Sequence, residues 1–235
     1  MKPITTLGPL QIGEAACVVG TITSAAMLRE FAGKRNEVCD IAEVRLDQVG
    51  QTEDWLSVCR EIEKSGTPVL LTARIRSEGG NWPDDDKSRL YVIREGLQHL
   101  AAVDVEFKSA LAGQVCLEAK ALKKAVIVSF HDFEKTPPFD ELKVIVTKAA
   151  KSGTIVKIST MVKNNEDIAT LQKLLECNSG VPLCVIGMGA YGTKTRVTFP
   201  AHGSCLTYGY LDTPSAPGQL SAQMLREQLG CSLTK

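Results

Sequence analysis

The amino-acid sequence predicts an α/β fold in which eight βα units close into a single (β/α)8 barrel, or TIM barrel. Eight short apolar runs recur along the 235 residues, and segments with helical spacing separate them. Most of the runs are continuously apolar, which is typical of strands buried on both faces of a parallel sheet. The length suits one barrel, so we expect residues 1–235 to form one domain.

The predicted strands follow one another at short intervals. Closure into a barrel is favoured because it leaves no exposed edge strand. In chain order the eight strands are Ala16–Ile22, Asp40–Leu46, Pro68–Arg74, Ala101–Phe107, Ala125–His131, Thr154–Thr160, Pro182–Met188 and Cys205–Leu211.

Helical patterns lie between these strands. Asp140 and Asn165 stand at predicted N-cap positions, and Gly153 and Gly180 follow predicted helices where a left-handed residue would end them. The seventh connection, 189–204, has the weakest helical pattern. The clearest helical segments are Asp54–Lys64, Ser88–Leu100, Phe139–Lys151, Asp167–Cys177 and, after the last strand, Gln219–Leu229.

A doubly wound open sheet is the alternative fold. Such folds usually carry a glycine-rich phosphate-binding turn after an early strand, and the first strand of this chain continues into Gly20-Thr21-Ile22-Thr23 instead. The segment 187–192 matches G-x-G-x-x-G as text, but it follows the seventh strand and no suitable acidic residue comes after it. It is therefore weak evidence for a dinucleotide.

Composition indicates a small-molecule partner. The chain has 27 basic and 27 acidic residues, which gives no electrostatic footprint for nucleic acid or an anionic membrane. No apolar run is long enough to span a bilayer and no signal-peptide pattern is present, so we expect a soluble, cytoplasmic protein. The eight cysteines form no C-x-x-C pair, which argues against a metal site and suits a reducing compartment.

Polar residues concentrate at the carboxyl ends of the predicted strands, where a barrel places its reactive groups. Simpler interpretations stay open: Glu43 and Arg45 could form a structural ion pair, Arg74 could be an ordinary strand-end arginine, and 215–219 could be a plain turn. The residues concerned are Glu43, Arg45 and Asp47; Arg74, Arg76 and Glu78; Asp104 and Glu106; His131 and Asp132; Lys157; and Ser215–Gln219.

Lys157 is the strongest candidate for chemistry. It lies in mid-strand among Ile155, Val156 and Ile158, where burial would lower the pKa of its ammonium and supply a nucleophilic amine. His131 ends the preceding strand and could exchange a proton near neutral pH. A structural lysine held in a salt bridge is the competing interpretation.

Taken together, these segments resemble the type I 3-dehydroquinate dehydratases, a family of Schiff-base (β/α)8 enzymes of the shikimate pathway toward aromatic amino acids. The resemblance covers nearly the whole chain, with the pieces in the family's order. They are Glu43-Val44-Arg45-Leu46-Asp47, Arg74 with Glu78-Gly79-Gly80, Asp104-Val105-Glu106, Ser129-Phe130-His131-Asp132-Phe133 before Lys135-Thr136-Pro137, Lys157, Arg196, and Ser215-Ala216-Pro217-Gly218-Gln219.

The resemblance implies a dehydration of 3-dehydroquinate to 3-dehydroshikimate by syn elimination. Lys157 would form an imine with the C3 ketone, while His131 removes the C2 proton and later protonates the departing C1 hydroxyl. Glu78 would support His131, and Asp104 would orient or tune it. No metal or organic cofactor is implied.

The same resemblance implies the substrate contacts and a homodimer. Arg196 would bind the substrate carboxylate. The other implied contacts are Thr21, Glu43, Arg45 and Arg74, with Ser215 and Gln219 from a closing loop.

Two other functions remain open. A class I aldolase on the same barrel would also use a Lys157 imine but would release retro-aldol fragments. A catalytically silent barrel that binds a metabolite or a partner protein would form no imine.

Overall fold

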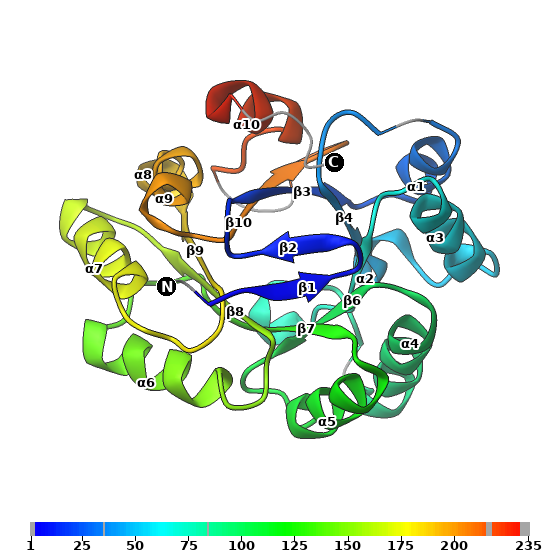
Figure 1. The fold of residues 1–235 in the computed structure, drawn as a ribbon, viewed down its shortest axis with the longest axis horizontal. Helices are drawn as coiled ribbons and strands as arrows, with labels where there is room; N and C mark the ends of the chain where they lie inside the picture. Colours follow the sequence, from blue (N-terminus) through cyan, green and yellow to red (C-terminus); the bar gives the residue numbers. More distant parts are fainter. Residues whose placement is uncertain (1–2, 35, 84, 215–217, 231–235) are drawn as a thin grey trace.

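A computed structural model describes residues 3–34, 36–83, 85–214 and 218–230, and it confirms the predicted barrel. Each predicted strand is present, with its ends within two residues of the predicted ones. Figure 1 looks along the barrel, with the strands around the centre and the helices outside them. The barrel strands are β3 (Cys17–Ile22), β4 (Ile41–Arg45), β5 (Val69–Thr72), β6 (Ala102–Glu106), β7 (Ala125–Asp132), β8 (Ile155–Met161), β9 (Leu183–Met188) and β10 (Leu206–Tyr210).

The eight strands are parallel, and each pairs with its neighbour in the order β10-β3-β4-β5-β6-β7-β8-β9. Hydrogen bonds also cross the gap between β9 and β10: the Cys205 amide donates to the Leu183 carbonyl at 2.9 Å, and the Val185 amide donates to the Ser204 hydroxyl at 3.0 Å. The sheet therefore curls into a nearly closed barrel, and the open-sheet alternative is wrong.

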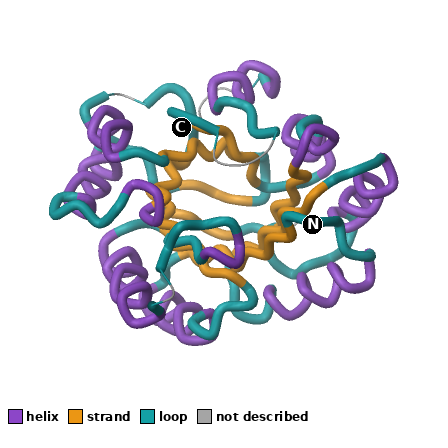
Figure 2. Tube along the Cα trace, turned by 180° about the vertical axis from the view of Figure 1, so that it is seen from behind, coloured by secondary structure: helices purple, strands orange, loops and turns teal. Residues whose placement is uncertain are grey.

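Helices surround the strands on the outside, as Figure 2 shows from the opposite side. Their buried residues recur at helical spacing; in α3, for example, Trp55, Val58, Cys59 and Ile62 face the sheet. The helices are α1 (Ala25–Ala32), α2 (Leu46–Val49), α3 (Trp55–Lys64), α4 (Asp86–His99), α5 (Ala112–Leu122), α6 (Phe139–Ala149), α7 (Asn165–Leu175), α8 (Gly189–Gly192), α9 (Thr195–His202) and α10 (Ala222–Leu229), with one 3-10 turn, η1 (Arg76–Glu78).

The two predicted N-caps are wrong by one or two residues. Asn164 caps α7, because its side chain accepts from the Asp167 amide, and Asn165 is the first helical residue. Pro138 precedes α6, and Asp140 lies in the first turn. A carboxylate there still interacts favourably with the positive end of the helix dipole.

The predicted glycine helix ends are also wrong. The C-caps of α6 and α7 are Ala150 and Glu176, both in the right-handed conformation. Gly153 and Gly180 lie further on, in the connections to the next strands, and of the two only Gly180 has a positive φ, at 75°. These helices therefore end before the residues that a glycine rule selects.

The seventh connection does contain helices, α8 and α9, although Pro200 lies inside α9. A proline cannot donate to the carbonyl four residues before it. The Thr207 hydroxyl replaces that donor, bonding to the Arg196 carbonyl at 2.8 Å. A tertiary contact thus offsets the cost of the proline, which explains why the local pattern predicts this helix poorly.

A hairpin that the sequence analysis did not predict closes the amino-terminal end of the barrel. Strands β1 (Thr5–Leu7) and β2 (Leu10–Ile12) pair antiparallel and lie across the end of the barrel in Figure 1. Leu7 and Ile12 are fully buried and belong to one apolar cluster with Ile127, Ile155 and Leu206 from the barrel interior. The hairpin therefore acts as an apolar plug.

Within the described part of the chain, no helix combines the length and apolar composition that crossing a membrane requires.

Candidate active site

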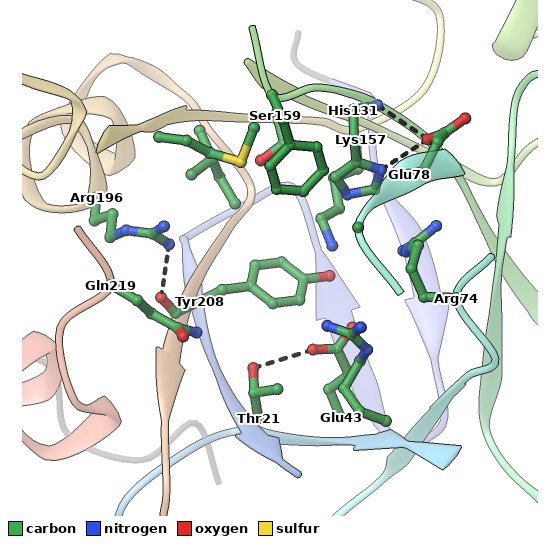
Figure 3. Close-up of a pocket in the computed structure, with 15 residues that line it drawn as sticks. Thr21, Glu43, Arg74, Glu78, His131, Lys157, Ser159, Arg196, Tyr208 and Gln219 are labelled. Carbon is green, nitrogen blue, oxygen red and sulfur yellow. Dashed lines mark hydrogen bonds and ion pairs between the residues drawn. The ribbon is translucent and has the colours of Figure 1, made fainter. Parts of the chain in front are cut away.

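A polar pocket lies at the opposite, carboxyl-terminal end of the barrel (Figure 3). Successive inward positions of a strand are two residues apart. The strands that contribute Ile127, Ile155 and Leu206 to the apolar cluster therefore also contribute side chains to this pocket. The open space at this end of the barrel, counted together with solvent at its mouth, is about 500 Å³. Its lining includes Thr21, Glu43, Arg45, Arg74, Glu78, Gly79, His131, Phe133, Lys157, Ser159, Ile186, Met188, Arg196, Tyr208 and Gln219.

Lys157 projects from the middle of β8 into this pocket and is buried. Its Nζ lies 3.8 Å from Asp104 Oδ2 and 4.0 Å from the centroid of the Tyr208 ring. The first contact is an ion pair beyond hydrogen-bonding distance, and Asp104 Oδ2 has no hydrogen-bond partner among the described residues. The carboxylate of Asp104 and the ring of Tyr208 therefore position the amine, and its nitrogen can still bond to a group that enters the cavity.

His131, near the end of β7, is positioned by Glu78 of η1. Glu78 Oε2 lies 2.9 Å from the imidazole Nδ1 and accepts the His131 backbone N–H at 3.1 Å. Burial and the cations Arg74 and Lys157 hold the pKa of His131 well below its ordinary value, so the ring is neutral at neutral pH. With its proton on Nδ1, facing Glu78, the imidazole carries a lone pair on Nε2. This is the form that a general base requires.

Glu78 is itself an unusual carboxyl group. Burial raises its pKa to about 7, against an opposing effect of Arg74. Its second oxygen, Oε1, is buried without a partner among the described residues. The carboxyl group can therefore gain or lose a proton near neutral pH beside His131.

Arg74 connects three strands behind Lys157. It donates to Asp104 Oδ1 at 2.8 Å and to the Ser129 hydroxyl at 2.8 Å, and it lies 3.0 Å from Glu106. Burial alone would lower the pKa of Arg74, but the carboxylates of Asp104 and Glu106 outweigh it and raise that pKa. Burial alone would raise the pKa of Asp104, but Arg74 and Lys157 outweigh it and lower that pKa. Asp104 thus stays ionised between two cations and sets the field at the amine.

Glu43 and Arg45 both line the pocket but do not form an ion pair with each other. Glu43 accepts from the hydroxyls of Thr21 at 3.0 Å and Thr72 at 2.9 Å. Arg45 makes a two-pronged contact with Asp47, at 2.9 and 2.8 Å. The structural interpretation of Glu43 and Arg45 as a pair is therefore wrong, and both side chains have partners that orient them along the pocket wall.

Arg196 of α9 stands on the far side of the pocket (Figure 3). One guanidinium N–H donates to the Tyr208 carbonyl at 3.0 Å, and Nε has no partner among the described residues. Burial lowers its pKa to about 10, and no described carboxylate forms an ion pair with it. A buried arginine of this kind is suited to binding an anion that enters the pocket.

The last predicted contacts come from the loop before α10. Gln219 lines the pocket, whereas Ser215 lies outside the described residues. The other residues predicted to act in catalysis or substrate binding line this cavity, and Asp104 lies directly behind it, whereas the strand-end candidates Arg76 and Asp132 are not among the lining residues.

Two hydroxyl-bearing residues of the pocket wall, Ser159 and Tyr208, were not among the predicted contacts. Strand alternation could have found both, because Ser159 is two residues after Lys157 on β8 and Tyr208 lies at an inward position of β10. Ser129 was named only as part of a family motif and was given no role; it lies two residues before His131, accepts from Arg74 at 2.8 Å and donates to Asp104 at 2.6 Å.

Comparisons with known proteins give one consistent result. The family model described as type I 3-dehydroquinase matches residues 16–234. A protein of Methanothrix thermoacetophila named 3-dehydroquinate dehydratase is 37% identical over 199 residues, covering 83% of each chain. One of the same name from Methanocella arvoryzae is 32% identical over 214 residues, covering 90% of this chain and 94% of that one. The solved type I 3-dehydroquinate dehydratase of Clostridium difficile, with covalently modified comenic acid, has the same fold, with a TM-score of 0.85, 24% identity and 98% of each chain covered.

Proposed function

The chain belongs to the type I 3-dehydroquinase family, and from this premise we propose that it dehydrates 3-dehydroquinate to 3-dehydroshikimate through an imine on Lys157. The observation that carries the proposal is a single pocket that joins a buried amine, a neutral imidazole and an arginine without a carboxylate partner among the described residues. These three groups match the ketone, the acidic C–H bond and the carboxylate of the substrate.

Binding and imine formation come first. The substrate carboxylate pairs with Arg196, which sets the ring so that its C3 ketone meets Lys157 Nζ. The amine adds to the carbonyl carbon, and the resulting carbinolamine loses water to give a protonated imine. The carboxylate of Asp104, 3.8 Å from Nζ, stabilises the positive charge on nitrogen in this intermediate.

Elimination follows from the imine. His131 Nε2 removes the C2 proton, and the electron pair of that C–H bond moves into the C2–C3 bond as the imine nitrogen accepts the C=N pair. The enamine then expels the C1 hydroxyl, which takes its proton from His131, so one residue serves first as base and then as acid. Hydrolysis of the product imine releases 3-dehydroshikimate and regenerates Lys157.

The remaining side chains hold the ring and its hydroxyls. Glu78 orients His131 through the 2.9 Å contact to Nδ1. We assign the hydroxyl-bearing edge of the ring to the wall formed by Thr21, Glu43, Arg45 and Arg74, and closure over the substrate to the loop with Ser215 and Gln219. We also propose that residues 1–235 act as one catalytic domain, in the cytoplasm and as a homodimer.

Turnover of 3-dehydroquinate tests this function. The expected result is the growth of the ultraviolet absorbance of a conjugated enone, with one molecule of 3-dehydroshikimate formed per substrate consumed. A folded protein that gives no such product contradicts the proposal, and retro-aldol fragments in place of water loss would assign the barrel to the aldolases.

A further inference from the structure

Tyr208 lines the pocket, and the proposed mechanism gives its side chain no role. It comes from β10, is almost completely buried, and places its ring 4.0 Å from Lys157 Nζ. Its hydroxyl is buried and has no hydrogen-bond partner among the described residues. Figure 3 shows the ring in the middle of the pocket.

A hydroxyl in this state needs an explanation. Burying a polar group without a partner is unfavourable, and phenylalanine would fill the same space without that cost. Burial, reinforced by Glu43, raises the pKa of Tyr208 well above its ordinary value, so the phenol keeps its proton and can donate. The hydroxyl is therefore a donor whose partner has to come from outside the described protein groups.

The direction of the side chain indicates which part of a substrate that partner is. The Tyr208 carbonyl accepts from Arg196 at 3.0 Å, so the residue starts at the carboxylate-binding end of the pocket. From there the side chain extends toward Lys157 and Arg74, with its hydroxyl at the leading end (Figure 3). The hydroxyl thus lies on the side of the pocket away from Arg196 and next to the imine-forming amine.

A six-membered ring bound in this pocket has a defined orientation. With C1, the ring carbon that bears the carboxylate, toward Arg196 and C3 bonded to Lys157, the ring atom opposite C1 is C4, which is also the neighbour of C3. C4 of 3-dehydroquinate carries a hydroxyl group. The oxygen on C4 is therefore the substrate atom that the geometry brings toward the Tyr208 hydroxyl.

We propose that Tyr208 is a specificity-determining residue that donates a hydrogen bond to the C4 hydroxyl of the substrate. The inference rests on the proposed function, because it takes the orientation of the ring from Arg196 and Lys157. Its consequence is a preference for ring ketones that carry a hydroxyl next to the carbonyl.

The test compares two proteins with two substrates. Tyr208→Phe removes only the hydroxyl and keeps the ring beside Lys157, and the second substrate is a 3-dehydroquinate analogue without the C4 hydroxyl. One neutral hydrogen bond corresponds to a loss of about tenfold in kcat/KM. We expect that loss for Tyr208→Phe with 3-dehydroquinate and little or no loss with the analogue.

Tyr210→Phe is the matched control. Tyr210 lies on the same strand and the same side, two residues on, and is not among the residues that line the pocket. It should leave kcat/KM unchanged for both substrates. An equal loss for both substrates in Tyr208→Phe, or no loss for either, would overturn the inference.

Thermal unfolding separates binding from structure. Because the Tyr208 hydroxyl lacks a described protein partner, Tyr208→Phe should unfold at the same temperature as the parent or higher, and a clear drop would mean that the hydroxyl supports the fold instead. The proposed function fails separately: a parent protein that does not dehydrate 3-dehydroquinate contradicts the function, whereas a fully active parent with an unaffected Tyr208→Phe contradicts only this inference.

Discussion

The two ends of the barrel interior are built from the same strands but differ in chemistry. At the amino-terminal end, inward residues such as Ile127, Ile155 and Leu206 pack with the hairpin residues Leu7 and Ile12 in an apolar cluster. At the carboxyl-terminal end, the next inward positions of the same strands are polar or charged. On these three strands the change takes place over one step of two residues, whereas on β9 the inward residues Ile186 and Met188 stay apolar and line the pocket.

Strand β8 shows the contrast most clearly. Ile155 is fully buried in the apolar layer, and Lys157, the next residue on the same side, lies in the pocket beside Asp104. Burial of an aliphatic side chain stabilises the fold, whereas burial of an ammonium opposes it. The apolar layer therefore supplies stability and the polar layer supplies chemistry. Substitutions in the polar layer should leave the stability of the fold largely unchanged, and substitutions in the apolar layer should leave the rate of catalysis largely unchanged.

The largest effect is expected from Lys157→Ala. Without the amine no imine forms, and we expect turnover to fall by on the order of 10⁴-fold or more. Arg74 still pairs with Asp104 at 2.8 Å, so the unfolding temperature should stay close to that of the parent. Lys163→Ala, at an exposed lysine that follows β8, is the control and should retain full activity. Comparable activity in both variants would contradict the role of Lys157, and a large drop in the unfolding temperature of Lys157→Ala would contradict the separation of layers.

His131→Ala should have the next largest effect on rate. Loss of a general base and acid lowers kcat by about 10²–10⁴-fold. The Lys157 amine remains, so borohydride should still trap the substrate on the enzyme. A variant that cannot be trapped would show that His131 is required for imine formation, contrary to a role confined to proton transfer after the imine has formed.

Ile155→Ala is the corresponding substitution in the apolar layer. Truncating a fully buried isoleucine lowers the free energy of unfolding by about 2–5 kcal/mol, through lost burial and the cavity left behind. Urea denaturation measures this change. The kcat of the protein that remains folded should be close to the parent value, and a loss of kcat as large as that of His131→Ala would mean that the layers are coupled.

Glu78→Gln should sharpen the comparison through pH. Burial raises the folded-state pKa of Glu78 from 4.5 to about 7, so the folded protein favours the protonated form. Its contribution to stability is complete below about pH 4.5 and is lost as pH rises through about 7, a change of about 3 kcal/mol. Glutamine stays neutral and does not lose this contribution. The difference in unfolding temperature, variant minus parent, should therefore increase as pH rises from 5 to 8. A constant difference over this range would contradict the shifted pKa.

The two layers also differ in how well the sequence predicts them. Continuous apolar runs identify all eight barrel strands to within two residues, because burial on both faces leaves a direct record in composition. The β1–β2 hairpin was not predicted because strands of three residues are too short to show an alternating pattern. Helix α9 was predicted poorly because it contains Pro200, whose missing hydrogen bond is replaced by one from the Thr207 hydroxyl of a neighbouring strand.

For the site, the sequence predicts which residues gather but not their pairing. Lys157 and His131 are found because titratable groups in or at the end of buried strands are conspicuous, whereas Arg196 is found only through the family's motifs. The partners depend on contacts that composition does not record: Arg45 pairs with Asp47 two residues further on, and the pairing of β5 with β6 places Arg74 beside Asp104 and Glu106. Tyr208 escapes because an aromatic residue in an apolar strand looks like ordinary core.

Covalent capture on Lys157 can be measured most directly by reducing a turnover mixture of the protein and 3-dehydroquinate with borohydride and locating the added mass by peptide mass spectrometry. A reduced adduct on the peptide that contains Lys157, absent from Lys157→Ala, is the expected result. A protein that turns over but carries no adduct, or carries it on another lysine, would contradict the assignment of Lys157.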